Sequence, residues 1–149
     1  MITWCDKDYL IIISDVAPQT AVRTPLPSDS KEERKDKKKK PYINKVEVVF
    51  YINYLGTAYH VYIPRDYTWD GASTPGFHHL PGLLEASMVH DIICENKEMI
   101  GYDRQLSSMV FREIGIASGV NKAFMYLAYC AVDNFQKIFA KDKKGNKWR

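Results

Sequence analysis

The sequence contains few cysteines and lacks any long apolar run. Its three cysteines, Cys5, Cys94 and Cys130, are an odd number without CxxC spacing. This favours reduced, mostly buried thiols over a disulfide framework or a zinc site. No stretch approaches the roughly 20 apolar residues needed to cross a bilayer, and the N-terminus lacks a secretory signal pattern. We therefore expect no transmembrane segment, and a protein that stays in the cytoplasm or is packaged from it.

The positive charge is unevenly distributed. Residues 31–40 hold seven basic and three acidic groups, and residues 137–149 hold six basic and one acidic. The chain has a net charge of +3, so the remaining body carries −6. Such runs are usually solvated, but clustered lysines also attract phosphate-rich partners. The alternative to a solvated role is therefore weak contact with nucleic acid or an anionic surface, through the basic tail (residues 140–149) and four lysines: Lys37, Lys38, Lys39 and Lys40.

The length and composition predict one folded domain over residues 1–149. The chain is 46% hydrophobic and 26% charged, as in a globular protein with its own core. Residues 17–41 have no periodicity, carry Pro18, Pro25 and Pro27, and end in the charge run. We expect a flexible loop or insertion there, because long stretches without a pattern are functional or disordered.

Strand patterns lie in the first half of the chain. The apolar run Tyr9–Ile13, within residues 2–14, predicts a strand buried on both faces. Residues 42–64 alternate between apolar and polar side chains around a turn at residues 53–56, which predicts a β-hairpin. The inward side chains of its first strand are Val46, Val48, Phe50 and Ile52.

Helical patterns fill the chain beyond Leu83, where apolar residues recur at helical spacing in three segments. The first and second segments have apolar faces at Met88, Val89, Ile92 and Ile93 and at Leu106, Met109, Val110 and Ile114. Asp103 is placed to cap the second helix and Asn121 the third, whose inner side we expect at Phe124, Leu127, Ala128, Ala131, Phe135 and Ile138. This order predicts an α+β fold, with a small antiparallel sheet of the N-terminal strand and hairpin packed on three C-terminal helices.

A turn-rich segment, residues 67–77, connects the strands to the helices. Gly71 allows a tight turn or the close approach of a ligand, and Asp70 and Ser73 can accept hydrogen bonds. The segment therefore suits a substrate loop formed by Asp70, Gly71 and Ser73. A structural Asx-turn explains the same residues equally well.

The first predicted helix carries a stripe opposite its apolar face, formed by Ser87, His90, Asp91 and Cys94. Neighbours on a helix point about 100° apart, so His90 and Asp91 cannot hydrogen-bond each other well. We interpret His90 as a base that activates water, with Asp103 orienting the imidazole and with Asp91 and Asp70 as ligands of a calcium ion. The alternative is that the stripe merely faces solvent.

These motifs resemble a family of small bacteriophage and prophage proteins of unassigned function. The shared features are the DGAS-x-P loop (residues 70–75) and an HD pair on a helix (His90 and Asp91), followed by an Asp-containing helix and an aromatic-rich helix. The match covers residues 67–135. It implies a phage origin, in the host cytoplasm or the virion, with other phage proteins or a host factor as partners.

The same segment resembles, more distantly, bacterial and viral phospholipases A-two. In that pattern a DG-x-S loop precedes a helix bearing HD. The resemblance implies His90 as the base, Asp91 as the calcium ligand, Asp103 as the support of the histidine, and carbonyl groups near Gly71 as further calcium ligands. The cysteines that brace those enzymes are missing here, apart from Cys94.

Two functions follow as hypotheses. The first is a phage accessory or virion-associated hydrolase with a polar Asp/His site, acting on an ester or cell-envelope substrate and dependent on calcium if Asp91 and Asp70 bind it. The second is a non-enzymatic structural or host-interaction protein in which the same motifs only hold the fold.

Overall fold

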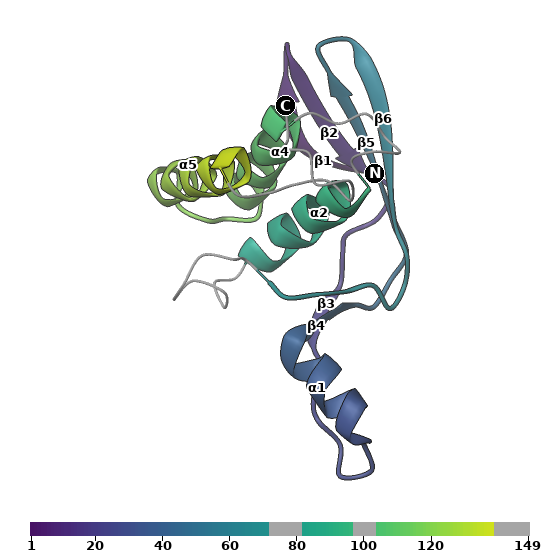
Figure 1. The fold of residues 1–149 in the computed structure, drawn as a ribbon. Helices are drawn as coiled ribbons and strands as arrows, with labels where there is room; N and C mark the ends of the chain where they lie inside the picture. The colour runs from purple at the N-terminus through teal and green to yellow at the C-terminus, as the bar shows by residue number, and fades with distance from the viewer. Residues whose placement is uncertain (72–81, 97–103, 139–149) are drawn as a thin grey trace.

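The computed structural model describes residues 1–71, 82–96 and 104–138, without the side chains of residues 135–138. A four-stranded antiparallel sheet, in the order β1-β2-β5-β6, consists of β1 (Ile2–Lys7), β2 (Leu10–Ser14), β5 (Val48–Tyr54) and β6 (Thr57–Ile63). Two helices, α2 (Leu83–Glu95) and α4 (Arg104–Ala117), lie against one face of this sheet, and a third, α5 (Lys122–Ile138), packs on the outer side of α4. The α+β prediction is confirmed (Figure 1).

The hairpin β5–β6 follows its predicted pattern. Val48, Phe50 and Ile52 are buried. The turn is the two-residue pair Leu55-Gly56, and both residues have positive φ, as a tight hairpin requires. The buried faces of β2, β5 and β6 pack against α2 and α4, so the core lies between the sheet and these helices.

The N-terminal segment differs from the expectation. Residues 2–14 form two strands, β1 and β2, which pair as a hairpin instead of a single strand. The prediction that the Tyr9–Ile13 run is buried on both faces was wrong, because β2 alternates: Leu10 and Ile12 are fully buried, while Ile11 and Ile13 are half-buried. The other face of the sheet carries no helix of the described chain, so β2 needs only one apolar side (Figure 1).

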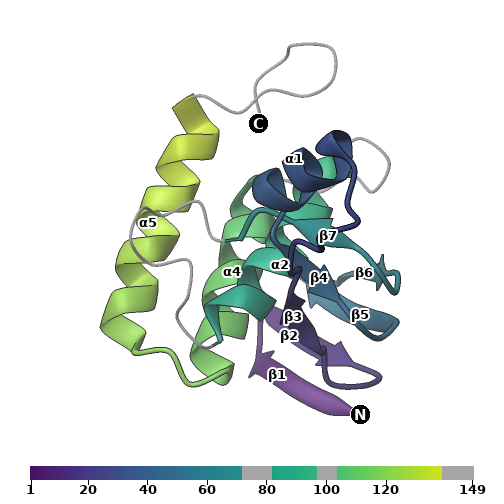
Figure 2. The same ribbon diagram turned by 90° about the horizontal axis from the view of Figure 1, so that it is seen from below.

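The third helix begins as predicted but is rotated from the expected face. Asn121 caps it, since its side-chain oxygen accepts a hydrogen bond from the amide of Phe124. Met125 and Ala128 are buried, whereas Leu127 is 69% exposed and Ala131 is also exposed. α5 packs on α4 alone among the helices and lies on its outer side, so a narrow stripe is enough to hold it (Figure 2).

Residues 17–41, where the sequence predicted a flexible loop or insertion, contain secondary structure in the described chain. They contain β3 (Thr20–Val22) and α1 (Lys31–Lys39). β3 pairs with β4 (Tyr42–Asn44), which in turn pairs with β7 (Thr68–Trp69), giving a second, three-stranded sheet. Residues 20–44, hereafter the basic arm, project from the body with α1 at the far side of this sheet (Figure 1).

No helix in the described part of the chain is long and apolar enough to cross a membrane. Of the cysteines, Cys5 is buried with its thiol donating to the Leu10 carbonyl at 3.4 Å. Burial raises the pKa of the Cys5 thiol to about 11, so it is an inert core residue.

Candidate functional site

Helix α2 places three reactive side chains together. The His90 imidazole lies between the Asp91 carboxylate and the Cys94 thiol: Nδ1 is 3.6 Å from Asp91 Oδ1, and Nε2 is 3.7 Å from Cys94 Sγ. The His90–Asp91 separation is an ion-pair distance and too long for a good hydrogen bond, as the positions of neighbours on a helix predict. The side chains of His90 and Asp91 are 12% and 22% exposed, so this stripe does not simply face solvent.

Ser87 belongs to the structure of the site and not to its chemistry. Its side chain is buried, accepts a hydrogen bond from the Trp69 indole at 3.0 Å and donates one to the Leu84 carbonyl at 2.9 Å. The Trp69–Ser87 hydrogen bond joins β7 to α2 and thereby fixes the start of the turn-rich segment against the helix. Ser87 therefore leaves the set of candidate reactive residues, although it lies on the same stripe.

Asp70 and Gly71 follow Trp69 directly and reach the helix. Asp70 and Asp91 line the same pocket, and the Asp70 carboxyl group raises the pKa of Asp91. Gly71 has φ of +90°, and a Cβ at this position would lie 2.6 Å from a ring carbon of Tyr42. Glycine is required here for both its backbone angle and its lack of a side chain, as the tight approach expected from the sequence implies.

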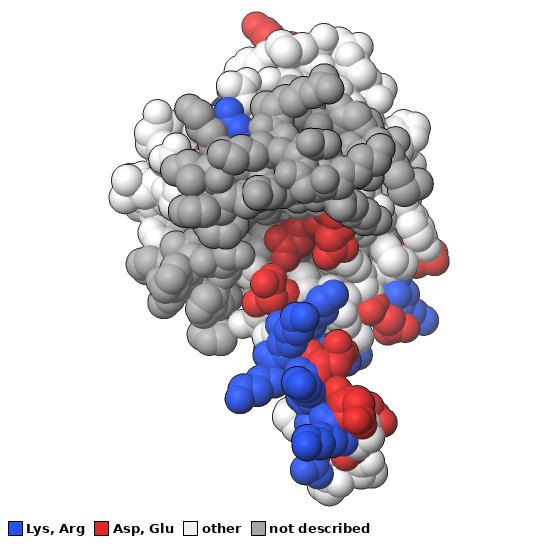
Figure 3. All heavy atoms as spheres, in the orientation of Figure 1, with Lys and Arg blue, Asp and Glu red and all other residues white. Residues whose placement is uncertain are grey.

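A pocket of about 250 Å³ lies where these elements meet. The acidic side chains and the thiol come from the body, and two lysines come from the end of α1 in the basic arm. Figure 3 shows the basic side chains of the arm directly beside acidic side chains where the arm joins the body. The lining residues are Lys39, Lys40, Trp69, Asp70, Asp91, Cys94 and Glu95.

The two ionisable groups on the helix have shifted pKa values. Burial raises the pKa of Asp91 to about 6; the neighbouring His90 lowers it and the Asp70 carboxyl raises it further. Burial alone would lower the pKa of His90. The neighbouring Cys94 and Asp91 side chains raise it by more than burial lowers it, so the pKa of His90 is raised to about 10. Between these values an imidazolium faces a carboxylate.

Aromatic side chains support both groups. The His90 ring packs edge-on against Phe111 of α4, with ring centroids 5.5 Å apart. On the other side, Tyr67 stacks on Trp69 and donates its hydroxyl to Glu95 at 3.1 Å. These contacts hold the imidazole and the pocket wall in place.

Some predicted site residues have other positions. Ser73 and Asp103 lie outside the described residues, so their expected roles are not addressed. Lys37, which the sequence suggested as a contact for a polyanion, pairs with Asp29 at 2.7 Å. Lys38 is exposed. Lys39 and Lys40 line the pocket, which their positions in a charge run do not reveal.

The carboxylates of Asp70 and Asp91 do not by themselves complete a calcium site. Calcium takes six to eight oxygen ligands, and within the described ranges no cluster of three or more potential metal-binding side chains is present. We therefore derive no step through a metal ion.

The fold and this pocket define an α+β protein with an imidazole and carboxylates gathered at one junction between a short sheet and a helix. The chain belongs to a family described as proteins of unknown function, DUF1353, whose model matches residues 46–132, more than half of its length. Neither a search of curated proteins nor one of solved structures found a match. The matched span includes Asp70, His90 and Asp91 and excludes the whole basic arm.

Proposed function

We propose that this protein is a hydrolase that cleaves ester bonds in the pocket beside α2, with Asp91 as the base that activates water and His90 as the proton donor. The observation that carries the proposal is that Asp70 and Asp91 line one pocket, although Asp70 lies about 20 positions earlier in the chain, and that the His90 imidazole, which is not among the lining residues, lies 3.6 Å from Asp91. Two carboxylates at a cavity, with a histidine next to one of them, are groups that acid–base hydrolysis can use.

The protonation states support this division of roles. A base must be deprotonated and an acid protonated at the working pH. With a pKa of about 6, Asp91 is ionised at neutral pH, and with its raised pKa His90 is protonated there. The two environments push the pKa values apart in the order that an acid–base pair requires. In this proposal His90 is the acid, whereas the sequence suggested that it is the base.

The reaction balances with these two groups alone. Asp91 takes a proton from water as the water oxygen forms a bond to the ester carbonyl carbon. The bond between that carbon and the alcohol oxygen then breaks, and His90 gives its proton to the leaving oxygen. The products are an acid and an alcohol; transfer of the proton from Asp91 back to His90, through solvent, restores both groups.

Asp70 and Cys94 act in this proposal through their neighbours. Asp70 raises the pKa of Asp91 toward neutrality, which makes Asp91 a stronger base than an ordinary carboxylate. Cys94 lies beside His90 and favours its protonated form. Both are positioning residues, since neither is assigned a bond to the reacting atoms.

The biological setting that we propose is that of a bacteriophage accessory or virion-associated protein. It is supported by the resemblance of the DGAS-x-P loop and the His90-Asp91 pair to small phage proteins. The second candidate function is a structural or host-interaction protein. The Trp69–Ser87 hydrogen bond and the Gly71 turn favour it, because both hold the fold without needing any reaction.

Hydrolysis of a chromogenic ester, 4-nitrophenyl acetate, tests the proposal through its pH dependence. We expect kcat/KM to rise through about pH 6 as Asp91 ionises and to fall through about pH 10 as His90 loses its proton. Asp91→Asn should abolish the enzymatic rate and its rising limb, while Asp8→Asn, an exposed carboxylate in the β1–β2 turn, should leave both unchanged. Rates in Asp91→Asn equal to those of the original protein would favour the non-enzymatic function.

A further inference from the structure

We propose that Lys39 and Lys40 form an anion-binding wall of the pocket, which selects substrates that carry a carboxylate or phosphate group away from the bond to be cleaved. This inference rests on the proposed function, because it names the substrate class of the same site. It assigns to the basic arm a role in substrate recognition.

The pocket has two walls of opposite charge. Lys39 and Lys40 form one, and Asp70, Asp91 and Glu95 belong to the other. Although they share one pocket, within the described part of the chain neither lysine ammonium forms an ion pair with these carboxylates or with any other group. Lys39 and Lys40 thus line the cavity without an ion-pair partner among the described residues, which leaves their charges available to an anionic ligand.

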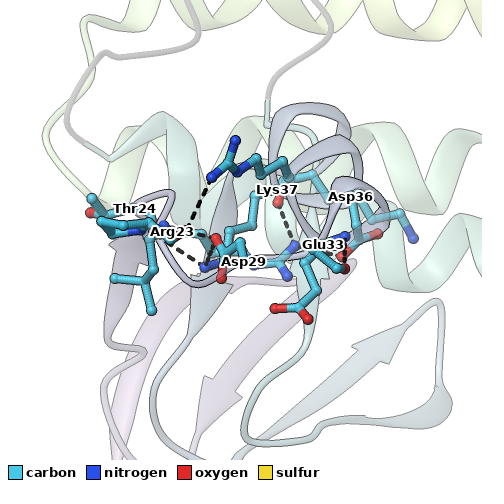
Figure 4. A network of polar contacts seen from close by, with 11 residues as sticks. Arg23, Thr24, Asp29, Glu33, Asp36 and Lys37 are labelled. Carbon is cyan, nitrogen blue, oxygen red and sulfur yellow. Dashed lines mark hydrogen bonds and ion pairs between the residues drawn. The ribbon is translucent and has the colours of Figure 1, made fainter.

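The lysines are held in place by the architecture of the basic arm. Lys37 donates to the Thr24 carbonyl and pairs with Asp29, and Arg23 pairs with Asp36 at 2.9 Å (Figure 4). Arg23 also donates to the carbonyl of Lys40 at 2.9 Å, which fixes the residue that ends α1. A helix with no buried residue is thereby held to the rest of the arm by polar contacts, and the pairing of β4 with β7 joins the arm to the body. An ordered cationic wall loses less entropy on binding than a flexible chain does.

The two walls also differ in their relation to the family. The acidic wall and His90 lie within residues 46–132, the span that matches the family model, while Lys39 and Lys40 lie before it. The reacting groups thus belong to the shared part of the fold, and the cationic wall belongs to a segment outside it. This division is expected when one chemistry is retained and substrate choice is set by an added segment.

The charge arrangement also determines which part of the ligand faces which wall. An anionic group next to Asp70 and Asp91 would be repelled, so it has to lie against the lysines. The neutral ester group is then left beside Asp91, the lining residue that contacts His90. A pocket of about 250 Å³ suits a small acyl or aromatic unit between these two ends.

Binding of three small probes tests the inference independently of catalysis. Benzoate, phenyl phosphate and neutral acetophenone, none of which contains a carboxylic ester bond, are titrated by calorimetry into the full-length protein, into Lys39→Gln/Lys40→Gln, and into the matched control Lys35→Gln/Lys38→Gln. The control removes two exposed charges from the same helix, neither of which lines the pocket. The ratio of the benzoate and phenyl phosphate affinities shows which anion the wall prefers.

We expect both anions to bind at least about ten-fold more tightly than acetophenone. Lys39→Gln/Lys40→Gln should remove that preference, a loss of about ten-fold for two partly exposed charges, while the control stays within about two-fold. No preference for anions in the original protein, or equal losses in the two double variants, would overturn the inference. Since no probe is hydrolysed at His90, this result is separate from that of the ester assay: loss of hydrolysis with intact anion selectivity would refute the proposed reaction alone.

Discussion

Replacing Trp69 by alanine lowers the free energy of unfolding by about 3–5 kcal/mol, the largest effect on stability that we expect from one substitution near the site. Trp69 is 1% exposed and lies between Tyr42 and Tyr67, with ring centroids 5.9 and 6.0 Å away. Removing the indole leaves a cavity under β7 and deprives Ser87 of a hydrogen bond. The measurement is urea unfolding followed by circular dichroism.

Two control variants separate the contributions of Trp69. Trp69→Phe keeps most of the apolar volume and loses the bond to Ser87, so we expect a smaller decrease, including about 1 kcal/mol for the hydrogen bond. Tyr62→Ala removes an aromatic side chain that is 52% exposed on β6, and should change stability much less. If Trp69→Ala were no more destabilising than Tyr62→Ala, the anchoring role of Trp69 would be wrong.

Replacing His90 by glutamine reduces kcat/KM for ester hydrolysis by about 10²–10⁴-fold, the range that one acid–base group contributes. Glutamine keeps a polar side chain of similar length but cannot donate a proton to the leaving oxygen. The substitution leaves the apolar side of α2 in place, so the melting temperature should change little compared with the loss of activity.

The matched control for this substitution is His60→Gln. His60 lies on β6, where it contacts Tyr51 with ring centroids 5.0 Å apart and does not line the pocket. The same chemical change there should leave kcat/KM unchanged. A similar decrease in both variants, or unchanged turnover in His90→Gln, would contradict the role of His90.

The strong regularities of the chain were predictable from the sequence. Alternation in residues 48–54, together with the Leu55-Gly56 pair, determined the hairpin, because burial on one side of a sheet requires period two. The β1–β2 hairpin was missed because its turn, at Asp8-Tyr9, has no glycine or proline. Strands β3, β4 and β7 contain two or three residues each, too few to show a period.

Helix α1 was missed although the sequence carries a signal for it. The helix has no buried residue, so apolar periodicity could not reveal it. Ser30 and Glu33 nevertheless form the start of a capping box, and the Ser30 hydroxyl accepts a hydrogen bond from the Glu33 amide at 3.1 Å. Acidic residues in the first turn and lysines in the last also match the helix dipole. These terminal signals outweigh the prolines that precede the helix.

The candidate site was predictable in its local part and not in its distant part. His90, Asp91 and Cys94 lie within one turn of a helix, so their spacing alone places them together. The approach of Lys39 and Lys40 depends on the pairing of β3, β4 and β7, which brings the end of α1 to α2. No pattern within the lysine run encodes that contact.

The central claim is that His90 is a cation paired with Asp91 in the folded protein, and nitrogen NMR of the imidazole tests it most directly. We predict that the His90 ring nitrogens remain protonated at neutral pH and lose a proton only near pH 10, and that Asp91→Asn lowers this pKa because it removes the carboxylate that favours the charged ring. Titration near the ordinary histidine value, unchanged in Asp91→Asn, would contradict the claim.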